Sequence, residues 1–265
     1  MQEEKVYLIT GSSQGIGLEL ARQLLKKGNK VCLNGRSLKK FSAIQQELTI
    51  YNGKFHYALG DIGKKEDADK IANECIDVFG KIDALILNAG ISNYGKILET
   101  DPDVVTQVFN TNLLGNFYLL KSALPQLISN RGSILFISSL AGIFGLPDYA
   151  PYSASKMALT AMYQSLQIEL KGKDIFVGIT FVGFTENEKS KRTYSPDGKL
   201  EEVPNRKGFS PYTREETARK IIHQLEKKKN FSVHSFIGKT LFILSRLSPS
   251  LLLFAFKKVY KKTIS

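Results

Sequence analysis

The sequence has few of the residues that metal centres and disulfide frameworks need. Its 265 residues include two cysteines, Cys32 and Cys75, and three histidines, His56, His223 and His234. The cysteines form no CxxC pair and the histidines lie far apart, so the sequence predicts no metal site. Two isolated thiols argue against a disulfide-stapled secreted scaffold and favour a reducing compartment, which predicts a cytoplasmic protein.

The sequence also has no tryptophan, no low-complexity tract and no internal repeat. The first five residues are polar and acidic and lead directly into a strand-like run, a pattern that predicts no signal peptide. A hydrophobic content of 43% with 23% charged residues is ordinary for a globular protein. The chain length suits one large α/β domain.

Acidic residues are absent from the C-terminal segment. Residues 231–265 contain six lysines and arginines and no aspartate or glutamate, so these 35 residues carry half of the net charge of +12. A basic balance fits nucleic acid, an anionic membrane or a phosphorylated ligand. The tail holds apolar runs at 241–244 and 251–256 instead of interleaved aromatic and arginine residues, which predicts no nucleic-acid binding.

The two apolar runs of this tail are separated by Arg246 and Pro249. Neither reaches the roughly 20 apolar residues that a membrane-spanning helix requires. One hypothesis is an interfacial segment over 236–262, with apolar side chains in the headgroup boundary and lysines facing anionic lipid. The other is a C-terminal helix or arm that caps a pocket or packs in a dimer. The two hypotheses are compatible, and the sequence leaves both open.

Short apolar runs alternate with amphipathic ones over the first 181 residues. Strands are predicted at 5–10, 30–34, 55–59, 84–88, 133–138 and 175–181. Helices are predicted at 15–27, 38–48, 64–79, 102–128 and 152–170, with Pro125 ending or bending the fourth. This alternation predicts an α/β fold: one doubly wound parallel sheet (Rossmann fold) in three α/β/α layers. Ligand sites in such a sheet lie at the carboxyl ends of the strands.

The prediction is a single domain over residues 1–265. Its parts are a core over 1–183, a substrate lid over 184–212, a helix over 213–230 and the basic apolar segment over 231–265. The lid segment is polar and carries three prolines, which is typical of a long loop without regular structure. Thr213 and Glu216 have the spacing of a capping box, so a helix is expected to begin there.

A glycine-rich turn, TGSSQGIG over 10–17, joins the first predicted strand to the first predicted helix. Its glycines permit a tight turn and the close approach of a pyrophosphate, which the helix N-terminus attracts. The spacing is GxxxGxG and not GxGxxG, and a purely structural turn is the alternative. The predicted cofactor contacts here are Gly11, Ser13, Gln14, Gly15, Ile16 and Gly17.

The second predicted strand ends in NGRS over 34–37 and offers no carboxylate for the ribose of NAD. Arg36 is well placed to pair with a 2′-phosphate, which favours NADP(H) over NAD(H); the alternative is a solvated surface arginine. Two further strand ends point to the same cofactor. The predicted contacts there are Asp61 and Ile62, for the adenine amino group, and Asn88, Ala89 and Gly90, which face the cofactor cleft.

Tyr152 and Lys156 stand four residues apart at the start of a predicted helix. A phenol has an ordinary pKa of about 10, and a cation one helical turn away stabilises the phenolate and lowers that pKa. Such a pair is a proton-transfer device, although most YxxxK pairs are surface neighbours. Ser139 lies thirteen residues upstream of Tyr152 and adds a hydroxyl group.

Together these motifs resemble the classical short-chain dehydrogenase/reductase family. The resemblance covers roughly 6–181 and uses the family's motifs in order: TGxxxGIG, Asp61, NAG over 88–90, Asn112, Ser139 and YxxxK. It implies that Tyr152 is the general acid or base and that Lys156 lowers its pKa and hydrogen-bonds the nicotinamide ribose. It further implies that Ser139 orients the substrate oxygen, and that Asn112 holds a relay water. A homodimer or homotetramer is the family expectation.

One position departs from the family pattern. The sixth strand is usually followed by Pro-Gly and then by a threonine that contacts the carboxamide. Here Val182 replaces the proline, while Gly183 and Thr185 are kept. The substitution is expected to alter how the lid is hinged, and Thr185 is the predicted contact of the carboxamide.

The function predicted from the sequence is an NADP(H)-dependent oxidoreductase that acts on a carbonyl or secondary alcohol. The apolar tail and the aromatic residues Phe184, Phe209 and Tyr212 favour a lipophilic substrate. The alternative is an NAD(P)-sensing regulatory or binding protein on the same scaffold. A degraded catalytic set would favour the alternative, and in this chain the set is complete.

Overall fold

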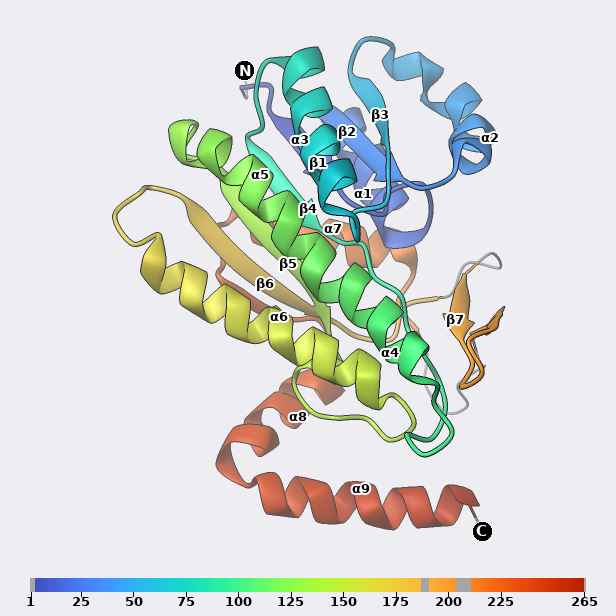
Figure 1. Ribbon diagram of the computed structural model, residues 1–265. Helices are drawn as coiled ribbons and strands as arrows, with labels where there is room; N and C mark the ends of the chain where they lie inside the picture. Colours follow the sequence, from blue (N-terminus) through green and yellow to red (C-terminus); the bar gives the residue numbers. More distant parts are fainter. Residues whose placement is uncertain (1–2, 187–190, 204–210, 265) are drawn as a thin grey trace.

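A parallel sheet of seven strands forms the centre of the part of the chain that the structure describes (Figure 1). This computed structural model describes residues 3–186, 191–203 and 211–264. The strand order is β3-β2-β1-β4-β5-β6-β9. The strands are β1 (Val6–Ile9), β2 (Lys30–Gly35), β3 (Phe55–Leu59), β4 (Ala84–Leu87), β5 (Ser133–Ser139), β6 (Phe176–Val182) and β9 (Phe231–Val233).

Helices cover both faces of the sheet. In chain order, the helices of the described residues are α1 (Gly15–Lys26), α2 (Leu38–Leu48), α3 (Lys65–Phe79), α4 (Pro102–Phe109), α5 (Gly115–Ser129), α6 (Ala150–Glu169), α7 (Arg214–Glu226), α8 (Phe236–Leu247) and α9 (Pro249–Ile264). Side chains alternate along β1: Val6 and Leu8 pack with α3, α5 and α6, whereas Tyr7 and Ile9 pack with α1 and α7. The doubly wound three-layer fold is therefore confirmed.

The strand order reverses between β1 and β4. The chain moves outward through β2 and β3, then returns to the other side of β1, so that Leu8 pairs with both Cys32 and Leu85. The loops that follow β1 and β4 diverge at this point and leave a crevice at the carboxyl end of the sheet. The topology thus places the glycine-rich turn and the Asn88–Gly90 segment side by side.

Three sequence-based expectations are wrong in detail. A seventh parallel strand, β9, pairs with β6, so the sheet does not end at residue 183. The segment expected to lack regular structure contains an antiparallel hairpin, β7 (Arg192–Tyr194) with β8 (Leu200–Glu202). The helix expected over 102–128 is α4 and α5 joined by a π-helical turn at Asn110–Leu114, and it continues through Pro125 to Ser129.

The predicted capping box is confirmed at the start of α7. The hydroxyl of Thr213 accepts a hydrogen bond from the N–H of Glu216 at 3.0 Å, and the Glu216 carboxylate accepts one from the N–H of Thr213 at 3.0 Å. These two bonds satisfy N–H groups that the first helical turn leaves unpaired.

The basic apolar tail forms the helices α8 and α9, which lie below the sheet in Figure 1. Leu241 and Phe242 of α8 pack against the hydrophobic core. In α9 the ring of Phe256 lies 4.9 Å from that of Phe144, and the Tyr260 hydroxyl donates to Asp148 at 2.8 Å. Among the described residues, no helix is long and apolar enough to cross a membrane.

Candidate active site

A cleft of about 860 Å³ opens at the carboxyl ends of the strands. Fifteen of the predicted site residues line it: Gly11, Ser13, Gln14, Gly15, Ile16, Arg36, Asp61, Ile62, Asn88, Ala89, Gly90, Ser139, Tyr152, Lys156 and Thr185. The remaining two, Gly17 and Asn112, are buried behind this lining. Loops after β1, β2, β3, β4 and β5 and the first turns of α6 therefore converge on one space.

The glycine-rich turn follows β1 and fits closely against the segment after β4. Gly11 has a φ of +61°, and a side chain there would lie 3.0 Å from the Cα of Ala89. Thr10, which the sequence reasoning assigned no role of its own, accepts hydrogen bonds from the N–H groups of Asn88 and Ala89 at 2.9 and 2.8 Å. These contacts fix the two loops that border the crevice.

Gly17 has a packing role in the first turns of α1. A Cβ at this position would lie 2.6 Å from both the side-chain nitrogen of Asn88 and the carbonyl oxygen of Gly11. We expect Gly17→Ala to lower the free energy of unfolding by about 1–3 kcal/mol, the usual cost of overpacking. Gly145→Ala, where no atom lies within 4 Å of the added Cβ, is the control and should change it by less than about 0.5 kcal/mol. Equal urea midpoints for both variants would contradict this packing.

At the end of the cleft formed by the loops after β2 and β3, two predicted cofactor residues contact each other. The guanidinium of Arg36 lies 3.3 Å from the Asp61 carboxylate, and the Arg36 side chain is 57% exposed. Lys40, one turn into α2, lines the same cleft, and its ammonium donates to the side chain of Gln14. Lys40 is not among the cofactor residues predicted from the sequence. Its position three residues after Ser37, the N-cap of α2, could have indicated that it faces the cleft.

Tyr152 and Lys156 lie on the first turns of α6 and line the same cleft as Ser139. The N–H of Tyr152 donates to the Asn93 side chain at 3.0 Å, which fixes the start of the helix. The ammonium of Lys156 lies 5.9 Å from the centre of the Tyr152 ring and donates to the carbonyl of Ile137 at 3.0 Å. The pair is therefore not an exposed surface pair, because its lysine is buried.

Burial, and to a smaller extent the charge of Lys191, lower the pKa of Lys156 to about 8. In the unfolded chain the ordinary value is 10.5, so unfolding between these pH values takes up a proton. The unfavourable contribution of the buried charge is therefore complete below pH 8 and is relieved as the pH rises from 8 towards 10.5.

This linkage predicts a pH-dependent stability difference between the wild type and Lys156→Met. From about pH 7.5 to about pH 9.5 the wild type should gain about 2 kcal/mol relative to the variant. Urea unfolding at the two pH values measures the difference, and Lys171→Met at an exposed position is the matched control. A constant gap between wild type and Lys156→Met would contradict the depressed pKa.

Asn112 lies in the π-helical turn and is fully buried. Its amide nitrogen donates to Ile91 O and Ser155 Oγ, both at 2.9 Å, and its side-chain oxygen accepts from Ile91 N–H at 2.8 Å. A Cβ on Gly90 would lie 3.2 Å from both the Asn112 oxygen and the Lys156 ammonium. Asn112 thus joins the loop after β4 to α6, and its oxygen faces the same point as Lys156.

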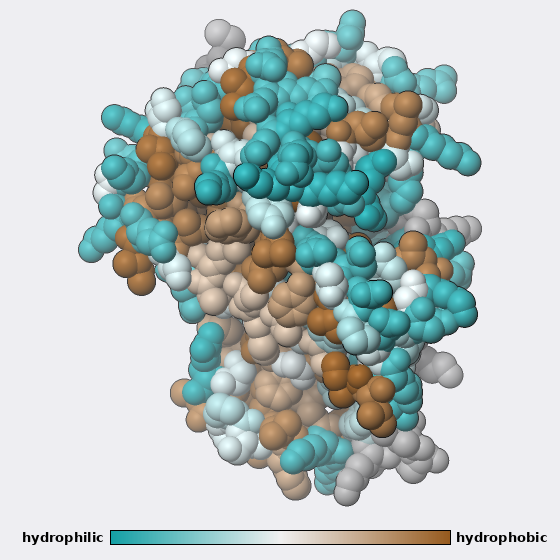
Figure 2. Space-filling view, in the orientation of Figure 1, coloured by the Kyte–Doolittle hydropathy of each residue, from teal (hydrophilic) through white to brown (hydrophobic). Residues whose placement is uncertain are grey.

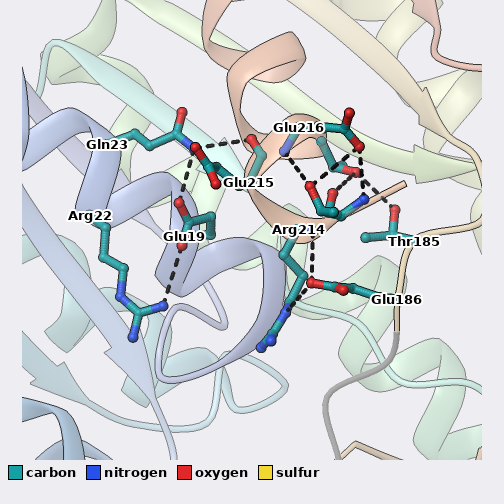
Figure 3. Close-up of polar contacts among 10 residues, drawn as sticks. Glu19, Arg22, Gln23, Thr185, Glu186, Arg214, Glu215 and Glu216 are labelled. Carbon is teal, nitrogen blue, oxygen red and sulfur yellow. Dashed lines mark hydrogen bonds and ion pairs between the residues drawn. The ribbon is translucent and has the colours of Figure 1, made fainter. Parts of the chain in front are cut away.

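Thr185 lies beside the start of α7 (Figure 3). Its hydroxyl lies 3.0 Å from that of Thr217, which itself donates to the carbonyl of Thr213 at 2.9 Å. Because the hydroxyl proton of Thr217 is donated to Thr213, the hydroxyl of Thr185 is the donor to Thr217. The lone pairs of the Thr185 hydroxyl can then accept hydrogen bonds from the side of the cleft. Next to Thr185, the Glu186 carboxylate accepts a hydrogen bond from the Arg214 backbone N–H at 3.1 Å and pairs with the Arg214 guanidinium at 3.1 Å, and these two contacts lower the pKa of Glu186.

Val182, which stands where the family usually has proline, is the last residue of β6 and pairs with Ser139. The strand thus runs to the edge of the cleft, and the segment predicted to be a lid begins directly after Gly183. The chain returns at Tyr212, whose backbone pairs with Phe184 and Glu186. The base of the predicted lid is therefore held by backbone hydrogen bonds.

The far end of the cleft, beside β5 and β6 and opposite the end with Arg36, is mainly apolar. Its lining includes Ile91, Leu140, Leu146, Tyr149, Val182, Phe184, Leu200 and Val203, together with Lys191 and Arg192. Of the three aromatic residues that suggested a lipophilic substrate, Phe184 lines the cleft, Tyr212 lies against the Lys220 ammonium, and Phe209 is outside the described residues. The described part of the chain contains no cluster of three or more potential metal-binding side chains.

Comparison with known proteins agrees with this geometry. The model of the short chain dehydrogenase family matches residues 5–197. The chain belongs to the short-chain dehydrogenase/reductase family. Dehydrogenase/reductase SDR family member 7B of Xenopus tropicalis is 31% identical over 257 residues, which cover 94% of this chain and 83% of that protein. As a member of this family, the chain is an oxidoreductase that acts on a carbonyl or CH–OH group with a nicotinamide cofactor.

Two solved structures show the range of cofactors in related members of the short-chain dehydrogenase/reductase family. An alcohol dehydrogenase from Thermococcus sibiricus, complexed with 5-hydroxy-NADP, has a TM-score of 0.73 and 26% identity and covers 88% of this chain and 95% of its own. A family member from Burkholderia phymatum in complex with NAD has a TM-score of 0.78 and 19% identity, covering 90% and 92%. The fold is thus compatible with both dinucleotides.

Proposed function

We propose that the protein is an NADP(H)-dependent oxidoreductase that reduces a lipophilic ketone or aldehyde, or oxidises the corresponding alcohol, with Tyr152 as the general acid or base. One observation carries this proposal: Tyr152, Lys156 and Ser139 line the same cleft as the glycine-rich turn. The groups that handle a proton therefore lie next to the groups that would hold a dinucleotide.

The residues of the cleft fit a dinucleotide. The N-terminus of α1 at Gly15 and the backbone of the glycine-rich turn line the cleft, where they would hold the pyrophosphate. Gly90 leaves space beside Lys156 that a Cβ would fill, which would admit the nicotinamide ribose. Thr185 offers an acceptor for the carboxamide. A bound nicotinamide supplies the hydride in reduction and accepts it in oxidation.

The chain's own groups supply the proton and the position. In reduction, the Tyr152 hydroxyl gives its proton to the substrate oxygen as that oxygen gains negative charge, and in oxidation the phenolate takes the proton back. The Lys156 ammonium favours the phenolate through its charge. The Ser139 hydroxyl donates to the same substrate oxygen and orients it.

Asn112 completes the proposed proton path as a positioning residue. Its side chain is bonded to Ile91 and Ser155, so one lone pair of its oxygen is left to accept from a water beside Lys156. That water would connect the buried ammonium with solvent. Ser155 connects Asn112 to the first turns of α6, because its hydroxyl accepts from Asn112 and donates to the carbonyl of Tyr152 at 2.7 Å.

The preference for NADP(H) rests on two cations. Arg36 and Lys40 both line the adenosine end, where they would pair with a 2′-phosphate, and no carboxylate follows β2 to bind a free ribose hydroxyl. The related alcohol dehydrogenase with 5-hydroxy-NADP bound supports this choice. Asp61 would release Arg36 to the phosphate and contact the adenine amino group together with the loop at Ile62.

The apolar lining at the far end of the cleft supports a lipophilic substrate. A panel of ketones of increasing chain length, tested with NADPH and with NADH, measures both assignments. We expect kcat/KM to rise with chain length and to be higher with NADPH. The competing function is an NAD(P) sensor on this scaffold, for which the same panel would show cofactor binding without turnover.

We also propose that the protein acts in the cytoplasm as a homodimer or homotetramer. Leu114 and Phe117 support an interface, since they stand exposed next to each other on the π-helical turn and α5. Sedimentation of the full chain measures the state, and a monomer at all concentrations would contradict it.

A further inference from the structure

The helices α8 and α9 leave many large apolar side chains exposed. Among the residues they expose are Phe236, Ile237, Ile243, Leu247, Leu251, Leu253, Phe254 and Val259. Phe236 is 82% exposed, Leu247 79% and Phe254 65%. Large exposed apolar side chains gathered on two consecutive helices indicate a site of interaction. We name this set, together with the exposed basic residues of the two helices, the tail surface.

The charge of the tail surface indicates what it binds. Its basic residues Lys239, Arg246, Lys257 and Lys258 are exposed, and residues 231–265 contain no acidic side chain at all. Figure 2 shows hydrophobic side chains beside hydrophilic ones over the lower part of the molecule, where Figure 1 places these helices. Apolar residues that enter a headgroup layer, flanked by cations that pair with its phosphates, fit an anionic lipid bilayer.

The geometry points to one occupant: we propose that the tail surface docks the protein on an anionic lipid membrane, with the far end of the cleft next to the membrane. A second copy of the chain would place the same cations opposite one another, with no carboxylate in the tail to balance them. A bilayer with acidic phospholipids supplies both the apolar layer and the negative charge.

Contacts of α9 connect the tail surface to the cleft. Its inner face packs Phe256 against Phe144 and bonds Tyr260 to Asp148, so it braces the loop over 143–149. Two residues of this loop, Leu146 and Tyr149, line the apolar end of the cleft. The docked helix therefore lies one loop away from the space where we place the substrate, which gives a lipophilic molecule a short path out of the bilayer.

Flotation of the full-length chain with vesicles tests the docking without cofactor or substrate, so its outcome is independent of the proposed function. The vesicles are phosphatidylcholine alone and about 7:3 phosphatidylcholine and phosphatidylserine. We expect the wild type to float with the anionic vesicles and to be released by salt. Leu247→Glu with Phe254→Glu should weaken binding about tenfold or more, since two apolar side chains no longer enter the lipid.

A second pair of variants tests the charge. Lys257→Glu with Lys258→Glu should weaken binding to the anionic vesicles about tenfold or more and leave the fold intact, because both side chains are exposed. Ile50→Glu is the control: Ile50 is a 78% exposed apolar residue directly after α2, which lies far from α8 and α9 in Figure 1, and the variant should float like the wild type.

Three results would overturn the proposal. The first is a wild type that floats with neither vesicle, and the second is equal flotation of both variant pairs and the wild type. The third is a dimer, in the absence of binding to vesicles, that Leu247→Glu with Phe254→Glu converts to a monomer, which would identify the tail surface as an interface between copies.

Discussion

Tyr152→Phe lowers kcat for ketone reduction by about 10²- to 10⁴-fold, the contribution that a general acid usually makes. The variant loses only the hydroxyl that gives the proton to the substrate oxygen. Its ring is retained on α6, where the backbone N–H still donates to Asn93. The KM for NADPH and the urea midpoint should therefore stay within about twofold and about 0.5 kcal/mol of the wild type.

Tyr149→Phe is the matched control for this variant. Tyr149 also lines the cleft, three residues before Tyr152, and it carries a hydroxyl that has no role in the proposed proton transfer. We expect its kcat to stay within about threefold of the wild type. A Tyr152→Phe enzyme that turns over at the wild-type rate would refute the assigned acid, whatever the control shows.

Arg36→Ala reverses much of the preference between the two dinucleotides. Removing a charged hydrogen bond to the 2′-phosphate costs about 1.5–3 kcal/mol, which corresponds to about a 10- to 100-fold loss of kcat/KM with NADPH. The value with NADH should change by less than about threefold, because NADH has no phosphate to lose. Lys40→Ala should show a smaller loss in the same direction, since a lysine pairs with phosphate as a single point charge.

Lys39→Ala controls for the loss of positive charge at this end of the molecule. Lys39 is exposed on α2 and does not line the cleft, so we expect no more than about a twofold effect with either cofactor. Equal losses with NADPH and NADH in Arg36→Ala would show that Arg36 acts through Asp61 or the loop, and would contradict its pairing with a phosphate.

Much of the fold could be predicted from the sequence because its strands are buried on both faces. Continuous apolar runs followed by amphipathic helices leave few alternatives to a doubly wound parallel sheet. Strand β9 was not predicted, because its three residues, Phe231–Val233, are too few to show the alternation of buried and exposed side chains. The π-helical turn was not predicted, because its sequence, NTNLL, is compatible with an ordinary α-helix. Its wider turn is fixed by the contacts of Asn112 with Ile91 and Ser155.

The site was predictable to the extent that its residues belong to short motifs. The glycine-rich turn and Ser139 lie at strand ends, which the topology brings together, and the pair on α6 lies at the start of the helix that follows β5. The contacts that hold them were not readable, because Asn112 with Ser155 and Thr185 with Thr217 join segments far apart in the chain. Lys40 belongs to no motif, and the packing of α9 on the loop over 143–149 depends on the course of the whole tail.

Transfer of deuterium from NADPH that is deuterated at both C4 positions to a ketone tests the proposed reaction most directly, because it reports on hydride transfer and not on binding. Wild-type protein is incubated with the labelled cofactor and the panel of ketones, and the products are analysed by mass spectrometry. We expect the wild type to form a secondary alcohol that carries the deuterium on its carbinol carbon, and we expect Tyr152→Phe to lose this product. Saturable binding of NADPH with no labelled alcohol from any ketone or aldehyde would contradict it and would favour a dinucleotide sensor.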